Sequence, residues 1–220
     1  MKILVYPIGD NPYQKLLYDE FKKYSNVNVK FVRSEFIDSR HAFTLGFPIF
    51  PIRFLYYRII GWKILHLHWL SPFVFPTNFK LLRVLSSIYV LTFMYYLKLI
   101  GIKLVWTVHE VIPHEQEFHD DVLIRKIISR LCDGLIFHSR NSLDEATKLK
   151  FDTKSSVVIN HGNYLDIYPN TISKSAARKK LGLNTNDYVY LFFGMIKKYK
   201  GIEDLLLSFE KYLLPINQID

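Results

Sequence analysis

Short apolar segments alternate along the chain with longer segments in which apolar residues recur at helical spacing. Alternation of this kind is typical of βαβ units, in which helices connect the parallel strands of one sheet. Strands are expected at Lys2–Tyr6, Val27–Val32, Ile64–His68, Lys103–Val108, Gly134–Phe137 and Ser156–Ile159, and helices at Gln14–Tyr24, Asn78–Ile100, Val122–Leu131 and Ser142–Lys148. The pattern therefore predicts an α/β fold with a doubly wound, Rossmann-like parallel sheet.

The pattern changes after the last of these strands. A polar, turn-rich stretch follows, which is expected to hold a short basic helix at Ser175–Leu181. Beyond it, an apolar strand at Tyr188–Phe193 and a helix at Gly201–Leu214 are expected. One strand and one helix cannot bury a sheet, so they predict only the start of a second Rossmann-like domain. The predicted organisation is a first domain over residues 1–160, a linker over 161–185 and an incomplete second domain over 186–220.

The composition is that of a globular protein with a packed core, because 50% of the 220 residues are hydrophobic. The single cysteine, Cys132, excludes an internal disulfide and a cysteine-based zinc site, which fits a reducing compartment. The apolar run that follows Met1 is too short for the hydrophobic region of a signal peptide. The expected location is therefore the cytoplasm.

The formal net charge of +9 is unevenly distributed. No Asp or Glu lies between Asp38 and Glu110, while Lys and Arg recur there among many aromatic residues, as in FPIFPIRFLYYRIIGW at Phe47–Trp62. Two interpretations stay open: a surface that lies on anionic lipid, or an aromatic-rich core with a few solvated cations. The uncharged run Val84–Leu97 is shorter than the roughly 20 residues that span a bilayer, which favours a buried or interfacial helix. Nucleic acid is disfavoured as a partner, because no motif for binding it is recognisable.

The fourth expected strand ends in polar residues, in the sequence WTVHE at Trp106–Glu110. Because ligands of open parallel sheets bind at the carboxyl ends of the strands, His109 is expected to project into a crevice there. Its imidazole can hydrogen-bond a substrate hydroxyl or a phosphate oxygen, or it can be a satisfied structural group. The loop that follows adds Glu110, Asp120 and Asp121 as titratable neighbours.

Two other chemistries fit these residues less well. A zinc protease places two histidines at i and i+4 of one helix, whereas His109 and His114 are five positions apart and Pro113 would break the helix. His66 and His68 face the same side of their strand, where lining the core or the crevice is favoured over forming half of a metal site. A hydrolase nucleophile is disfavoured, because the chain has no Gly-x-Ser-x-Gly motif.

A second polar motif, LFFGMIKKYKG, lies at Leu191–Gly201. Gly194 allows the backbone to approach a ligand without a Cβ, and Lys197 and Lys200 place ammonium groups near the start of the next helix. This combination suits a diphosphate. A solvated loop with two lysines is the alternative.

In their order and spacing, several motifs together resemble the GT-B glycosyltransferases of family 4 type, particularly those that build bacterial surface polysaccharides. Besides LFFGMIKKYKG, the motifs are NPYQKLLY at Asn11–Tyr18, LHLHW at Leu65–Trp69, KLVWTVHEVIPHE at Lys103–Glu115, DGLIFHS at Asp133–Ser139 and VVINHGNY at Val157–Tyr164. The resemblance implies two Rossmann-like domains. The first would bind the acceptor, the second would hold the nucleotide diphosphate sugar, and the sugar would be transferred in the cleft.

The resemblance also implies roles for individual residues. His109 matches the histidine that faces the donor sugar, and Glu110, Asp120 or Asp121 would serve as general base if the enzyme inverts. Lys200 matches the lysine that grips the donor diphosphate, and Lys197 stands where the family usually has arginine. Further residues are expected at the donor diphosphate (Gly194, Gly9) and at the acceptor (Asn11, Tyr13, His68). The paired glutamates that hold the donor sugar in this family would come after residue 220.

The function implied is transfer of a sugar from a nucleotide diphosphate sugar to a lipid-linked glycan acceptor, without metal or other cofactor. The expected place is the inner face of the cytoplasmic membrane. The rival is a non-catalytic half of a split transferase that holds acceptor or partners, with the second half encoded separately. On either interpretation the chain alone is expected to be inactive.

Overall fold

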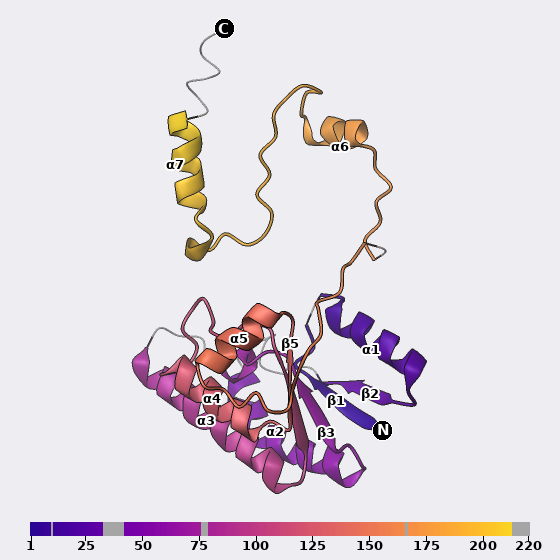
Figure 1. Ribbon diagram of the computed structural model, residues 1–220, viewed down its shortest axis with the longest axis vertical. Coiled ribbons are helices and arrows are strands. Elements are labelled where there is room, and N and C mark those ends of the chain that lie inside the picture. Colours follow the sequence, from indigo (N-terminus) through magenta and orange to yellow (C-terminus); the bar gives the residue numbers. More distant parts are fainter. Residues whose placement is uncertain (10, 33–41, 76–78, 166, 213–220) are drawn as a thin grey trace. The chain divides into compact units, whose positions relative to one another are not determined.

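The computed structural model describes residues 1–9, 11–32, 42–75, 79–165 and 167–212, and of residues 42–50 the backbone alone. They form two compact units, Met1–Ile167 and Tyr168–Asp220. The first unit is built on a parallel sheet of six strands (Figure 1), which confirms the predicted α/β fold. The strands are β1 (Lys2–Tyr6), β2 (Asn28–Phe31), β3 (Ile64–Leu67), β4 (Lys103–Val108), β5 (Gly134–Phe137) and β6 (Ser156–Val158).

The strand order is β2-β1-β3-β4-β5-β6. The chain therefore leaves β1 for β2 on one side and crosses back to β3 on the other side of β1. In a doubly wound sheet, the point where the direction of winding changes is where the loops separate and ligands bind. Here that point lies between the carboxyl ends of β1 and β3.

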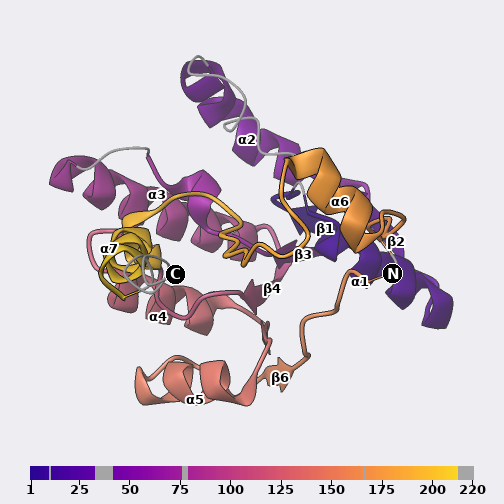
Figure 2. The same ribbon diagram turned by 90° about the horizontal axis from the view of Figure 1, so that it is seen from above.

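Helices cover the two faces of the sheet unequally (Figures 1 and 2). One face is covered by α1 (Tyr13–Tyr24), whose buried Tyr18 packs with Ile3, Val5 and Val27. The other face is covered by α2 (Ala42–Ile59), α3 (Lys80–Leu99), α4 (Asp121–Leu131) and α5 (Arg140–Lys148), and a short 3-10 helix, η1 (Ser71–Phe73), follows β3.

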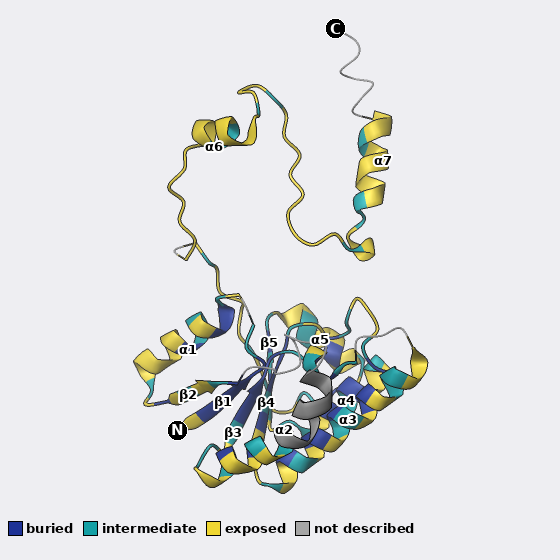
Figure 3. Ribbon diagram, turned by 180° about the vertical axis from the view of Figure 1, so that it is seen from behind, coloured by how far each residue is buried: buried dark blue, intermediate teal, exposed yellow. Residues whose placement is uncertain are grey.

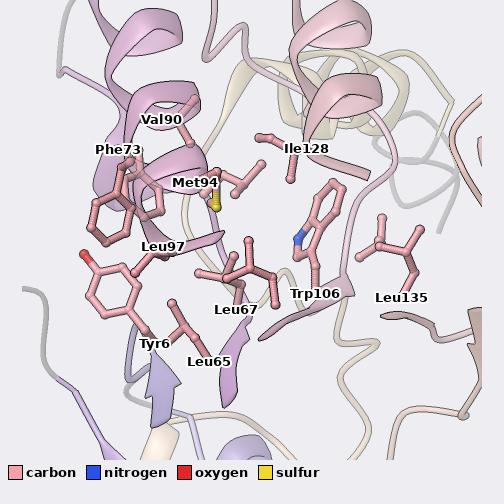
Figure 4. Packing of buried hydrophobic residues seen from close by; sticks show 14 of the residues in the cluster. Tyr6, Leu65, Leu67, Phe73, Val90, Met94, Leu97, Trp106, Ile128 and Leu135 are labelled. Atoms are coloured by element: carbon pink, nitrogen blue, oxygen red, sulfur yellow. The ribbon is translucent and has the colours of Figure 1, made fainter. Parts of the chain in front are cut away.

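The main core lies between the sheet and α3 and α4. Alternate side chains of a strand point to opposite faces, so Leu65 and Leu67 of β3 and Trp106 of β4 share one face. In Figure 4 they meet Val90, Met94 and Leu97 of α3 and Ile128 of α4. This packing fixes where each strand ends along the edge of the sheet. It therefore also fixes where the residue that follows each strand projects.

One helix was not predicted, and one predicted strand is corrected. The aromatic segment forms helix α2, although Pro48 and Pro51 are typical helix breakers. Its Phe54 and Tyr57 are buried, with 0% and 5% of their surface exposed, so packing on the core outweighs local propensity. The strand expected at Tyr188–Phe193 does not form among the described residues, because a lone strand has no neighbour with which to share ladder hydrogen bonds.

The second unit contains α6 (Lys174–Leu181), the 3-10 helix η2 (Lys198–Lys200) and α7 (Ile202–Tyr212), and none of these has a buried residue. In Figure 3, α6 and α7 are accordingly coloured mostly as exposed. The boundaries of the predicted linker and second domain stay predictions.

Candidate functional site

Histidines follow the ends of consecutive strands. His68, His109 and His138 come directly after β3, β4 and β5, and His161 follows soon after β6. Because the carboxyl ends of parallel strands meet at one edge of a sheet, these imidazoles converge. The ring centroids of His109 and His138 are 5.0 Å apart, and those of His138 and His161 are 5.2 Å apart.

Tyr13, the first residue of α1, lies among these imidazoles and is 6% exposed. Its position follows from the turn before the helix, where the Asn11 side chain accepts a hydrogen bond from the Tyr13 backbone N–H at 3.2 Å. The Tyr13 ring stacks on His161, with centroids 4.5 Å apart. Its centroid lies 5.7, 5.4 and 5.4 Å from those of His68, His109 and His138. Two predicted acceptor residues, Tyr13 and His68, are thus in contact with the predicted sugar-facing His109.

Burial favours the uncharged forms of His68, His109, His138 and Tyr13. Burial, and then the neighbouring His138 and His161, lower the pKa of His109 to about 3. Burial also lowers the pKa of His68 and of His138, and it raises the pKa of the Tyr13 hydroxyl to about 12. A neutral imidazole offers one donor and one acceptor, so these side chains act as hydrogen-bonding groups and not as cations.

His66 and His68 differ in their partners. His66 is 5% exposed, its Nε2 lies 2.7 Å from Thr107 Oγ1 and its Nδ1 is paired with the Tyr18 hydroxyl, so it is a satisfied core residue. His68 is 1% exposed, and its Nδ1 lies 3.4 Å from Nε2 of His109, while its Nε2 has no partner among the described residues. The described residues contain no group of three or more His, Cys, Asp or Glu that is arranged to hold a metal ion.

A cavity of about 240 Å³ lies beside His109. Its wall includes His68, Trp69, Ser71, Glu110, Glu117 and Arg125. The buried Arg125 of α4 fixes the loop around it, because its Nη1 donates to the Glu110 carbonyl at 2.9 Å and its Nη2 to the Glu117 carboxylate. Burial raises the pKa of Glu117, and the positive charge of Arg125 opposes that rise.

The structure separates two of the acidic candidates, Glu110 and Asp120. Glu110 is exposed and lines the same cavity as His109. Asp120 instead caps the start of α4, where its carboxylate accepts a hydrogen bond from the Leu123 backbone N–H at 2.9 Å, and it is not part of the cavity wall. Its carboxylate has a structural role there, and the geometry favours Glu110 over Asp120 as a group near His109.

Gly9 lies on the loop after β1, at the switch point. Its backbone N–H donates to Gln14 Oε1 at 2.8 Å, and Gln14 Nε2 donates to the Pro7 carbonyl at 2.7 Å. Gln14 is 1% exposed, so a buried amide holds both sides of this loop.

In the second unit, the structure brings Gly194 and Lys200 together. Gly194 has a φ of 125°, and a Cβ added there would lie 3.3 Å from Lys200 Nζ. Lys197 is half-buried at the start of η2. An ammonium over a bare stretch of backbone is the local arrangement that the predicted diphosphate site requires.

Five further residues contribute to the site around His109 and were not predicted as site residues. His138 and His161 had a signal in the sequence, because each follows an apolar strand, as His68 and His109 do. The contributions of Gln14, Trp69 and Arg125 depend on which loops the fold brings together, and no local pattern marks them.

Comparison with known proteins gives one informative likeness. No protein-family model matches the chain, and neither does any curated protein. A crystal structure of Anabaena HepE in complex with UDP and glucose superposes with a TM-score of 0.55 at 16% sequence identity. The match covers 94% of this chain and 57% of that one, so the chain spans little more than half the length of that protein. A second HepE structure, in complex with UDP, has a TM-score of 0.46, which is too low to add an argument. At this identity the likeness shows a shared fold.

Proposed function

We propose that this chain is part of a glycosyltransferase that moves a sugar from a nucleotide diphosphate sugar to a lipid-linked glycan acceptor in the synthesis of a surface polysaccharide. The observation that carries the proposal is the cluster of imidazoles around Tyr13 at the carboxyl edge of the sheet. Such groups bind hydroxyl-rich ligands, because each can donate one hydrogen bond and accept another. The fold shared with HepE, a protein seen with UDP and glucose, supports a nucleotide sugar as co-substrate.

The roles follow from the charge that develops during transfer. Departure of the nucleotide diphosphate adds negative charge, which positive groups and backbone N–H groups stabilise. Lys197, Lys200 and the backbone at Gly194 would supply these groups, and Gly9 is also proposed for binding of the donor diphosphate. His109 would face the sugar with Glu110 beside it, and Asn11, Tyr13 and His68 would line the acceptor side.

A second candidate function is a non-catalytic half of a split transferase that binds acceptor or partners. It is favoured by the second unit, whose described helices α6, η2 and α7 have no buried residue and thus form no core of their own. On this interpretation the chain holds the acceptor, and another polypeptide supplies the donor site.

The test is a transfer assay with a panel of nucleotide sugars and lipid-linked acceptors. The 220-residue chain alone is expected to give no transfer, because the described helices of its second unit form no core that could hold the base, ribose and sugar of the donor. Adding a donor half in trans, or extending the chain with one, is expected to restore transfer. Robust transfer by the purified chain alone would contradict the incomplete donor site. Acceptor binding without transfer in any combination would favour the second candidate.

We also propose that α2 and α3 place the protein on an anionic membrane. Among the described helices, α3 alone is long and apolar enough to cross a bilayer, but Val90, Met94 and Leu97 lie in the core. Its opposite side exposes apolar residues (Leu81, Leu85, Ile88, Tyr95), and the neighbouring part of α2 exposes others (Ile52, Tyr56, Ile59). Basic residues lie on the same helices (Arg53, Arg58, Lys80). An apolar face bordered by cations is suited to the headgroup region of anionic lipid.

Sedimentation with vesicles tests this surface. The protein is expected to bind vesicles rich in phosphatidylglycerol and to lose affinity as salt rises, since each cation near the surface contributes about 1 kcal/mol. Replacing Leu81 and Ile88 together with glutamine should weaken binding. Replacing Tyr24, an exposed aromatic residue at the end of α1, with serine should not. Equal binding to neutral and anionic vesicles would contradict the proposal.

A further inference from the structure

We propose that Trp69 is a positioning residue for His109, and that Gly9 and Gln14 in turn hold Trp69 in place. The predicted effect of Trp69 on turnover rests on the proposed function. The predicted effect of Trp69 on the position of the imidazole rests on geometry alone. It assigns a role to an indole that the transfer chemistry itself does not use.

The first step is the contact between Trp69 and His109. Their rings are stacked, with centroids 4.8 Å apart and planes only 10° from parallel. The indole therefore covers one face of the imidazole. The Tyr13 ring meets the imidazole edge-on at 5.4 Å, and His68 Nδ1 lies 3.4 Å from its Nε2. Of these neighbours, Trp69 alone lies parallel to His109, so it sets the plane in which the imidazole lies.

The second step is the contact between Trp69 and Gly9. A Cβ added at Gly9 would lie 2.7 Å from Cη2 and 2.8 Å from Cζ3 of the Trp69 ring, closer than real Cβ contacts. Gly9 is thus needed for close approach of the backbone to the indole. The outer edge of the Trp69 ring lies against this bare backbone while its face stacks on the imidazole, so a side chain at position 9 would displace the indole from its place on His109.

The third step is the support of Gly9. The buried Gln14 accepts from the Gly9 N–H and donates to the Pro7 carbonyl, which fixes the loop that touches Trp69. The contacts run from Gln14 of α1 to Gly9 in the loop after β1, from there to Trp69, the second residue after β3, and then to His109, the residue after β4. They cross the switch point. We infer that Trp69 transmits the position of the Gly9 loop to His109.

The decisive measurement is the His109 imidazole resonance in protein with isotope-labelled histidine, assigned by its loss in His109→Gln. In Trp69→Leu, loss of the stacked indole should move the Hε1 resonance of His109 downfield, and Gly9→Ala should also shift it. Trp62→Leu, which removes another half-buried indole, is the matched control and should leave it in place. In protein that carries both halves, that is, this chain together with a donor half, Trp69→Leu should lower kcat roughly 10- to 100-fold with little change in donor KM. A small misplacement of a group at the reacting centre has an effect of this size.

Rescue separates positioning from simple packing. A phenyl ring ends short of the indole atoms that a Cβ at position 9 would meet, so Trp69→Phe should restore part of the kcat lost in Gly9→Ala. Should Trp69→Leu fail to fold, the comparison of Gly9→Ala with the double variant Gly9→Ala/Trp69→Phe tests the inference by itself. Unchanged His109 resonances in Trp69→Leu and Gly9→Ala, or additive losses in the double variant, would overturn the inference. Resonance shifts without transfer by any form of the protein would leave the inference standing and contradict the proposed function instead.

Discussion

Replacing His109 with alanine is expected to lower turnover roughly 100-fold in protein that carries both halves, if the imidazole contacts the sugar during transfer. The neutral imidazole can donate a hydrogen bond to an oxygen that gains charge, in a partly buried setting where such bonds are stronger than in water. Alanine removes this bond and leaves the Trp69 ring without its stacking partner. The loss should appear mainly in kcat, because the donor diphosphate is held elsewhere.

The matched control is His114→Ala, since His114 is exposed on the same loop. Steady-state kinetics of both variants, with the nucleotide sugar that supports transfer, provide the measurement. Unchanged kinetics in His109→Ala would reduce His109 to a structural residue.

Acidification from about pH 7.5 to about pH 5.5 is expected to lower the free energy of unfolding of the first unit by about 3 kcal/mol through His66 and His68. Burial lowers the pKa of His66 to about 4 and also lowers the pKa of His68. In the unfolded chain both titrate near pH 6.5. Between these values the unfolded state binds more protons, so this stability is present above about pH 6.5 and is lost as the pH falls.

Urea unfolding followed by tryptophan fluorescence tests this, because Trp62, Trp69 and Trp106 all lie in the first unit. The double variant His66→Gln/His68→Asn should show a weaker dependence on pH, even if it is less stable throughout. His114→Gln serves as the control with an exposed imidazole. An unfolding free energy that stays constant between the two pH values would contradict the buried, neutral state of these side chains.

The sheet was accessible from the sequence because its strands are short, apolar and separated by helices, and each was expected within one or two residues of its place. Helix α2 was not, because two prolines mask a helix that is stabilised by burial of Phe54 and Tyr57. The prediction of a strand at Tyr188–Phe193 was wrong, since a strand forms only beside another strand with which it shares hydrogen bonds. The local sequence pattern predicts a strand or helix correctly where the neighbouring elements it packs against are present. It fails where tertiary packing, and not local propensity, determines the secondary structure.

The same distinction holds for the site. His109 could be placed because a residue after a parallel strand projects at the carboxyl edge. Its neighbours could not, because the stack with Trp69 and the contact of Trp69 with Gly9 depend on which loops flank the switch point. Arg125 is a further case, since its hydrogen bonds to the Glu110 carbonyl and the Glu117 carboxylate exist only once α4 has packed beside the loop.

The most direct measurement is whether a nucleotide sugar reaches the His109 imidazole. In protein that carries both halves, histidine resonances would be recorded during titration with UDP-glucose, UDP-galactose, UDP-N-acetylglucosamine and GDP-mannose. For the nucleotide sugar that supports transfer, the His109 resonance is expected to shift and to saturate with the ligand, while that of exposed His114 stays in place. If transfer proceeds while the His109 resonance does not move, or if none of these nucleotide sugars binds, the carboxyl edge of this sheet is not where the sugar reacts.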